Sequence, residues 1–260
     1  MTRADVFLTE GGYVESRTRA ARLIEEGKVI IDGCNVAKAS DKISDGEHEV
    51  VITEKERFVS RGGLKLLAAI EAFDVDISGK RCIDIGASTG GFTDCLLQHG
   101  AKNVVAIDSG TAQLHESLLC NEKVVSVEGF NAKNLCKESF GEFDVAVMDV
   151  SFISQTMLHA NVSSILNDGA IYISLIKPQF EAGRSALGKK GIVKDARDRE
   201  RAVMRVLDSA EACGFYVKGI IASPIEGGDG NREYVACFVR LGNGTDTPYR
   251  ARFNIKELCR

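Results

Sequence analysis

The spacing of hydrophobic positions changes along the chain at about residue 80, which divides it into two predicted regions. In the first region Ala20, Leu23 and Ile24 recur at i, i+3 and i+4, and this spacing predicts the buried face of a short helix. Further on, Asp32-Gly33 stands between two apolar runs, which is typical of a tight hairpin turn. We therefore expect residues 1–56 to form a small α+β domain from two short helices and a hairpin.

In the second region short apolar segments alternate with helical stretches, which is the pattern of a mostly parallel α/β sheet. A barrel would need eight strand–helix pairs, so seven strands favour the Rossmann-like sheet of class I methyltransferases. The segments that read as strands are 81–85, 103–108, 123–127, 143–149, 170–176, 215–222 and 233–240. The longest helical stretch is 195–213. The expected division of the chain is a domain at 1–56, a basic linker at 57–62, the α/β domain at 63–242 and a tail at 243–260.

The first strand of the α/β domain runs into a glycine-rich turn, with glycines at positions 86, 90 and 91. Ligands of open α/β sheets bind at such turns, outside the carboxyl ends of the strands. A dinucleotide fingerprint would need a glycine where the chain has Ser88, so NAD is disfavoured. S-adenosyl-L-methionine has no pyrophosphate and needs only a close approach of the backbone, which small residues allow. The glycines alone are also compatible with a turn that binds no ligand.

Polar residues at two further strand ends fit the same ligand. Asp108 ends the second strand 22 residues after Gly86, near the offset of about 20 residues at which an acidic side chain meets ribose hydroxyls. Asp84 is a candidate partner for the ammonium group, and Asn131 for the adenine. The predicted cofactor-binding residues are thus Asp84, Gly86, Ser88, Gly90, Gly91, Asp108 and Asn131.

Four charged residues stand at the ends of predicted elements: Asp149 and Lys177 after strands, Lys65 at the start of a helix, and Glu233 at the start of the last strand. Singly, each is more often a solvated charge. Together they predict a site where a methyl group is transferred to an alcohol, because an alcohol must be positioned and must lose a proton. We expect Lys177 to be the base, Asp149 and Lys65 to orient it and the substrate hydroxyl, and Glu233 to tether a lysine or a ribose.

The segments RFVSRGGLKL, DIGASTGGFTD, DVSFIS, KPQFE and GNREY, in this order, resemble the TlyA family of ribosomal RNA 2′-O-methyltransferases. This family, also named hemolysin A, lies within the FtsJ-like group. Residues 1 to about 55 resemble the small S-four RNA-binding domain. The resemblance implies a catalytic Lys-Asp-Lys-Glu tetrad at Lys65, Asp149, Lys177 and Glu233, and methylation of a cytidine 2′-hydroxyl in RNA of one or both ribosomal subunits. In one departure, Phe58 stands where some members carry tryptophan.

The net charge of −4 excludes a uniformly basic nucleic-acid coat but allows local basic patches. Residues 16–42 hold 6 basic and 4 acidic groups, and residues 177–199 hold 7 and 3. Within the second stretch, 181–194 reads as a loop. Ribosomal RNA or ribosomal subunits are the expected partners, and phosphate contacts are expected at Arg17, Arg19, Arg22, Arg57 and Arg61. Phe92, Phe152 and Phe180 are expected to pack against the sheet rather than to stack on a base.

Other classes of protein are disfavoured. No apolar run approaches the roughly 18 to 20 residues of a membrane helix, and the N-terminus lacks the apolar centre of a signal peptide, so we expect a cytoplasmic protein without membrane or stable protein partners. The eight cysteines show no CxxC spacing, which favours buried thiols and predicts no metal site. Three alternatives remain: a noncatalytic RNA-binding or ribosome assembly factor, a nucleobase amino-methyltransferase, whose prolines are missing around Asp149, and a hemolysin.

Overall fold

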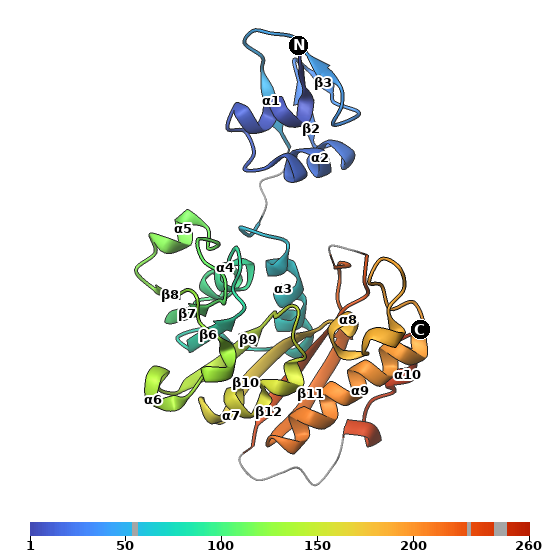
Figure 1. The fold of residues 1–260 in the computed structure, drawn as a ribbon. Coiled ribbons are helices and arrows are strands. Elements are labelled where there is room, and N and C mark those ends of the chain that lie inside the picture. The colour runs from blue at the N-terminus through green and yellow to red at the C-terminus, as the bar shows by residue number, and fades with distance from the viewer. Residues whose placement is uncertain (54–56, 228–229, 242–248) are drawn as a thin grey trace. The chain divides into compact units, whose positions relative to one another are not determined.

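The computed structural model describes residues 1–53, 57–227, 230–241 and 249–260 (Figure 1). The chain divides into two compact units, Met1–Arg57 and Phe58–Arg260, which are described separately.

The first unit is a small α+β domain, as expected. Helices α1 (Ala4–Glu10) and α2 (Arg17–Glu25) pack against each other and share one apolar core with two small sheets. Its strands are β1 (Thr2–Arg3), β2 (Val29–Ile31), β3 (Cys34–Asn35), β4 (Lys42–Ile43) and β5 (Val50–Ile52). The predicted hairpin joins β2 to β3, and both turn residues have positive φ, 51° at Asp32 and 76° at Gly33, which matches the twist of a tight hairpin. Two further pairs, β2 with β5 and β1 with β4, extend the prediction.

The second unit is built on a seven-stranded sheet within the described residues, which confirms the Rossmann-like fold class. The strand order is β11-β12-β10-β9-β6-β7-β8, with β12 antiparallel to both neighbours and the other pairs parallel. The strands are β6 (Arg81–Ile85), β7 (Asn103–Ile107), β8 (Val124–Val127), β9 (Phe143–Met148), β10 (Leu166–Ile176), β11 (Phe215–Ala222) and β12 (Tyr234–Arg240). Strand β10 begins earlier than predicted because its first part pairs with β9 across an irregularity between Leu166 and Ile171.

Helices cover both faces of this sheet (Figure 1). On β9, Val145 and Val147 belong to the apolar core under α3 (Gly62–Phe73) and α4 (Gly91–Gln98), whereas Ala146 belongs to the core under α7 (His159–Ser164) and α9 (Ala196–Ala212). This period of two is what a strand buried on both faces requires. The short helices are α5 (Glu116–Leu119), α6 (Lys137–Phe140), α8 (Pro178–Glu181), α10 (Ile255–Leu258), η1 (Ala132–Asn134), η2 (Gln155–Met157), η3 (Arg184–Ala186) and η4 (Tyr249–Ala251).

The structure differs from the expected division of the chain at both ends of the second unit. Most of the predicted linker 57–62 belongs to this unit, because Phe58 is buried in the same apolar core as α3. The part of the predicted tail that is described, 249–260, is also folded, since the buried Tyr249 and Ile255 join the core beside α9. Residues 242–248 lie outside the described residues.

The predicted loop 181–194 and the predicted buried thiols are only partly observed. Glu181 is the last residue of α8, and η3 interrupts the remainder of the segment. Four thiols are buried, at Cys82, Cys95, Cys237 and Cys259, whereas Cys34 and Cys120 are exposed. Among the described residues no helix is long and apolar enough to cross a bilayer. In the same part of the chain no group of three or more His, Cys, Asp or Glu side chains is arranged for a metal ion.

Candidate active site

Two neighbouring cavities lie at the carboxyl ends of the central strands, where open α/β sheets bind ligands. The larger, of about 600 Å³, extends along the ends of β7 and β9, and the smaller, of about 290 Å³, lies between α3 and the ends of β9 and β10. Both volumes are near the range of small-molecule pockets. Gly86, Ser88, Asp149 and Ser151 line both cavities. Two ligands, one in each cavity, would therefore meet at these four residues.

The glycine-rich turn after β6 forms part of this shared wall. Gly86 has φ of 83°, and a Cβ atom there would lie 2.6 Å from the carbonyl oxygen of Asp149. Ser88 also has positive φ, 48°, and lines both cavities, while Gly91 lines the smaller one. Gly90 lines neither: a Cβ atom there would lie 2.2 Å from the Leu118 side chain, so this glycine permits packing rather than ligand contact. The prediction for Gly90 is thus corrected.

Asp108 and Asn131 line the larger cavity, as their places after β7 and β8 predict. Both carboxylate oxygens of Asp108 accept hydrogen bonds from backbone N–H groups, one from Ser88 at 2.8 Å and one from Gly110 at 2.7 Å. The side-chain oxygen of Asn131 accepts a hydrogen bond from the N–H of Lys133 at 3.0 Å. Asp108 therefore ties the glycine-rich turn to the loop after β7, which the sequence did not reveal.

Asp84 lies outside the cavities. Its side chain is fully buried, one carboxylate oxygen accepts a hydrogen bond from Thr93 Oγ1 at 2.7 Å, and the other has no partner within the described residues. Burial raises the pKa of this carboxyl to about 7, against the opposing effect of the Thr93 hydrogen bond. The direct contact with a ligand ammonium group that the sequence suggested is not supported by this geometry. Instead, Asp84 stabilises α4 through its buried hydrogen bond with Thr93 of that helix.

The raised pKa of Asp84 predicts a pH-dependent contribution to stability. The folded state holds this proton up to about pH 7, whereas the unfolded state releases it near pH 4, so the contribution falls as the pH rises from 4 to 7. Asp84→Asn should therefore come within about 1 kcal/mol of the parent protein in free energy of unfolding near pH 4.5 and exceed it at pH 8, by at most about 4 kcal/mol at 1.36 kcal/mol per pKa unit. Urea unfolding at several pH values measures this, with the exposed Glu71→Gln as control. A difference that does not vary with pH would contradict the prediction.

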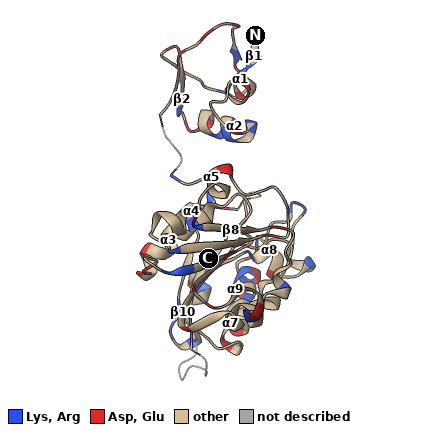
Figure 2. Ribbon diagram, turned by 90° about the vertical axis from the view of Figure 1, so that its left-hand side faces the viewer, with Lys and Arg blue, Asp and Glu red and all other residues tan. Residues whose placement is uncertain are grey.

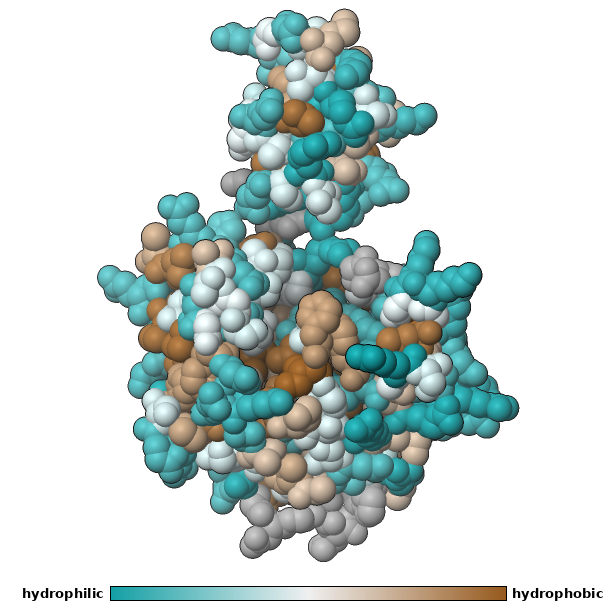
Figure 3. Space-filling model, in the orientation of Figure 1, coloured by the Kyte–Doolittle hydropathy of each residue, from teal (hydrophilic) through white to brown (hydrophobic). Residues whose placement is uncertain are grey.

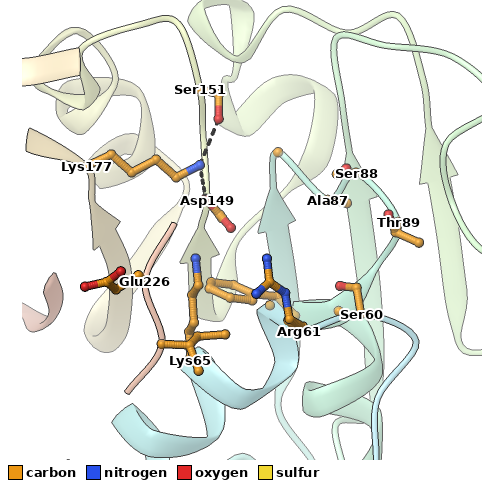
Figure 4. Close-up of a pocket in the computed structure, with 15 residues that line it drawn as sticks. Ser60, Arg61, Lys65, Ala87, Ser88, Thr89, Asp149, Ser151, Lys177 and Glu226 are labelled. Atoms are coloured by element: carbon orange, nitrogen blue, oxygen red, sulfur yellow. Dashed lines mark hydrogen bonds and ion pairs between the residues drawn. The ribbon is translucent and has the colours of Figure 1, made fainter. Parts of the chain in front are cut away.

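The four predicted catalytic residues form two pairs. Lys65 Nζ lies 2.5 Å from Glu233 Oε2, and Lys177 Nζ lies 2.6 Å from Asp149 Oδ1. The second contact is an ion pair without hydrogen-bond geometry, and Lys177 donates its hydrogen bond to Ser151 Oγ at 2.8 Å (Figure 4). Lys65, Asp149 and Lys177 line the smaller cavity, whereas Glu233 reaches it only through Lys65. Elements far apart in the sequence thus bring both amines to one cavity.

Several residues of this cavity were not singled out from the sequence. Ser151 contacts Lys177 and lines both cavities, and Glu226 lies on the far side of the smaller cavity from the glycine-rich turn (Figure 4). Ser60 and the predicted RNA contact Arg61 also line it. The position of Ser151 two residues after Asp149, at the same strand end, was the available signal.

The aromatic residues near the site differ in exposure. Phe92 is buried, as expected, but Phe152 is 92% exposed at the larger cavity, with φ of 64° and its ring centroid 5.3 Å from that of Phe180. The expectation that Phe152 packs against the sheet is therefore wrong. On the face of the second unit turned towards the viewer in Figure 3, apolar side chains lie in the middle and at the left, and hydrophilic ones predominate on the right.

The predicted RNA contacts of the first unit lie beside acidic side chains. The side chain of Arg17 is 60% exposed and lies 2.9 Å from Asp5, and α2 carries three arginines before Glu25 at its last position (Figure 2). Arg19 lies 3.0 Å from Glu15 and Arg22 lies 3.6 Å from Glu26. Arg57 is an exposed residue at the end of this unit. The carboxylates of Glu15 and Glu26 are exposed, and such pairs are weak, so Arg19 and Arg22 can exchange an acidic neighbour for a phosphate. The partner of Arg17 differs, because Asp5 is buried.

Comparisons with known proteins cover both units. FtsJ-like methyltransferases match residues 58–240, and the S4 domain matches residues 2–49. The 16S/23S rRNA (cytidine-2′-O)-methyltransferase TlyA of Mycobacterium tuberculosis is 44% identical over 253 residues, which span 96% of this chain and 93% of the relative. Hemolysin A of Brachyspira hyodysenteriae is 42% identical over 239 residues, 91% and 99% of the two chains. The solved structure of a Streptococcus thermophilus protein with a hemolysin name is 40% identical, with a TM-score of 0.78 over 99% of this chain and 94% of that one.

Proposed function

The chain belongs to the TlyA family of FtsJ-like, S-adenosylmethionine-dependent methyltransferases, and we propose that it methylates the ribose 2′-hydroxyl of a cytidine in ribosomal RNA. The observation that carries the proposal is the shared wall of the two cavities, where the glycine-rich turn meets Asp149 and the amine of Lys177. We further propose that the substrate is ribosomal RNA, free or within ribosomal subunits, and that the enzyme acts in the cytoplasm, where ribosomes are found.

The larger cavity fits S-adenosylmethionine. Its volume is adequate, and it offers Asp108 for the ribose, Asn131 and the apolar Phe130, Ile153 and Leu158 for the adenine, and the backbone of Gly86 for the methionine part. When bound, this cofactor supplies a methyl group on a positively charged sulfur. The smaller cavity, with Arg61, Lys65 and Lys177, then suits an anionic nucleotide.

The two charged pairs have different roles in the deprotonation of a ribose hydroxyl. In its neutral form Lys177 accepts the proton from the hydroxyl, and Asp149, at 2.6 Å, stabilises the ammonium that results. Lys65, held by its contact with Glu233, donates a hydrogen bond to the hydroxyl oxygen and so orients it. As the oxygen gains the methyl carbon it would lose its proton to Lys177. The bond from the methyl carbon to the cofactor sulfur would break, and neutral S-adenosylhomocysteine would leave, so the positive charge of the sulfur is replaced by that of the protonated amine.

The function is tested by supplying labelled S-adenosylmethionine with unmodified ribosomal subunits and with free ribosomal RNA, and then mapping the methyl group. We expect label on a cytidine 2′-oxygen, and the amounts on subunits and on free RNA show which of the two is the substrate. Label on a base nitrogen would favour an amino-methyltransferase. RNA binding without transfer would favour an assembly factor. Dye release from liposomes by the purified protein would support a hemolysin instead.

The arginines of α2 are expected to contact phosphates. Arg19→Ala with Arg22→Ala should reduce the slope of log K against log salt concentration by about 1 to 2, because each lost contact removes about 0.7 to 0.9. Filter binding of ribosomal RNA at several salt concentrations measures the slope. The control removes two charges at Lys80 and Lys102, beside the amino ends of β6 and β7, opposite the cavities. An unchanged slope in the arginine variant would mean that RNA binds elsewhere.

A further inference from the structure

A buried carboxylate outside the catalytic pairs holds the segment that follows Asp149. Glu181, the last residue of α8, is 3% exposed. One of its oxygens accepts a hydrogen bond from Ser154 Oγ at 2.5 Å, and the other from the backbone N–H of Gln155 at 2.8 Å. Burial raises the pKa of Glu181, and these hydrogen bonds oppose that effect. A carboxylate is costly to bury, so two bonds to one short segment mark it as a specific attachment.

The N-terminal end of the same short helix contacts the beginning of the segment. Lys177, the N-cap residue of α8, contacts Asp149 and Ser151, whereas Glu181 contacts residues 154 and 155. Strands β9 and β10 are parallel neighbours, so their carboxyl ends deliver the segment and the helix to the same place. Lys177 at the start of α8 and Glu181 at its end thus contact the two ends of the segment 149–155.

Strand β10 provides a third attachment. The side chain of Gln155 is buried, donates a hydrogen bond to the carbonyl oxygen of Leu175 at 3.3 Å, and accepts one from Ser174 Oγ. Residues 154 and 155 are therefore fixed by side-chain contacts on two sides. Such a site resists the small displacements that a free loop would allow.

Between the two attachments the backbone is strained. Phe152 has φ of 64°, a region that bulky residues rarely occupy and that costs about 1–3 kcal/mol. Its side chain is almost fully exposed, so burial of the ring does not compensate for this strain. The contacts on either side must hold the conformation. A conformation maintained in this way next to a reaction site is a mark of function.

We propose that Glu181 is a positioning residue for methyl transfer, which holds the segment 149–155 so that Ser151 fixes the amine of Lys177 in the smaller cavity. The inference rests on the proposed function. Glu181 lines neither cavity and touches no reacting atom; it acts through Ser154, Gln155 and then Ser151. Its loss should therefore change the rate of transfer through the placement of Lys177.

The first test is a double-mutant cycle in kcat at saturating cofactor and RNA. Glu181→Ala should lower kcat by about 10- to 100-fold, the cost of a misplaced catalytic group. Glu181→Gln, which can still accept from Gln155 and donate to Ser154, should keep most of the activity. Ser151→Ala should lower kcat by itself, and in its background Glu181→Ala should have almost no further effect. If the loss of kcat in the double variant equals the product of the losses in Ser151→Ala and Glu181→Ala, the two residues act independently and the proposal is overturned.

A control separates positioning from stability. Glu211 accepts a hydrogen bond from the backbone N–H of Tyr249 at 2.8 Å, far along α9, so Glu211→Ala loses a similar contact away from the site. It should lower the unfolding temperature and leave kcat unchanged. Should Glu181→Ala fail to fold, Ser154→Ala removes one of the two attachments and takes its place in the cycle.

The second test does not depend on turnover. The chain has no tryptophan, so Phe152→Trp introduces a single fluorescent reporter at the strained position. Its fluorescence anisotropy should fall when Glu181→Ala is added and should not change with Glu211→Ala. If the parent protein transfers no methyl group to any RNA, the proposed function fails, and the anisotropy still decides whether Glu181 holds the segment. Equal anisotropy with and without Glu181 would refute the inference.

Discussion

Lys177→Ala is expected to lower kcat for methyl transfer by about 10²- to 10⁴-fold, the usual contribution of a general base. The amine lines the smaller cavity, 2.6 Å from Asp149 and 2.8 Å from Ser151, whereas the other amine there, Lys65, is paired with Glu233. Because Lys177 does not line the larger cavity, cofactor affinity should change little. Steady-state transfer to ribosomal RNA at saturating cofactor gives kcat, and calorimetry with S-adenosylhomocysteine gives the affinity.

Two further variants separate the base from a mere positive charge. Lys177→Arg keeps the charge beside Asp149 but cannot lose its proton near neutral pH, so it should be about as inactive as Lys177→Ala. Lys218→Ala, an exposed lysine on the edge strand β11, should have the parent kcat. Substantial turnover by the arginine variant would assign Lys177 an electrostatic role and leave the proton to water.

The strands of the second unit were predictable because each has a strong local signal. Alternation is hidden where both faces of a strand are buried, but a short apolar run that ends in a polar residue is still visible, as in β9 before Asp149. All seven predicted strands are present, with ends that differ by a few residues. Polar strand ends of one parallel sheet meet at one edge, so the same signal also predicted that Asp108, Asp149 and Lys177 would lie near ligands.

The sequence predicted that Asp149 orients Lys177 and that Glu233 tethers a lysine or a ribose, but not that its partner is Lys65, because this pairing depends on tertiary packing. Lys65 and Glu233 are 168 positions apart, and their contact requires that α3 pack beside β12. The same holds for Asp84, whose burial depends on how α4 closes over β6. The sequence pattern around an aspartate at a strand end is the same whether its side chain faces a cavity or the core. Only the packing of neighbouring helices decides between the two.

Backbone conformation explains the remaining differences. The sequence around Phe152 is apolar, which suggests burial, but positive φ at this residue turns the ring outwards. Phe58 shows the opposite case, because a residue of the predicted linker is buried. Gly63 leaves room for its ring, since a Cβ atom at position 63 would lie only 2.3 Å from Cγ of Phe58. Neither outcome has a local signal, since both depend on contacts with residues of other elements.

Asp108→Ala is expected to raise the Kd for S-adenosylmethionine by about 10- to 100-fold, since hydrogen bonds to a charged group contribute about 1.5–3 kcal/mol. The carboxylate lines the larger cavity and is held by the N–H groups of Ser88 and Gly110, so its direction is fixed before a ligand binds. Because Asp108 does not line the smaller cavity, kcat at saturating cofactor should fall much less than the affinity. Calorimetry and initial rates measure the two effects.

The two backbone contacts of Asp108 raise a second explanation, in which the carboxylate only orders the loop after β7. Glu128→Ala tests it, because Glu128 accepts a hydrogen bond from the N–H of Ala112 in the same loop at 2.9 Å and does not line the larger cavity. If Asp108 binds the ribose, Glu128→Ala should have little effect on Kd. In that case an S-adenosylhomocysteine analogue without the ribose 2′-hydroxyl should also lose less affinity in Asp108→Ala than the complete ligand does. A contact between Asp108 and the ribose must depend on the hydroxyl that it binds. If Asp108→Ala loses the same affinity for both ligands, and Glu128→Ala loses a similar amount, Asp108 acts through the loop.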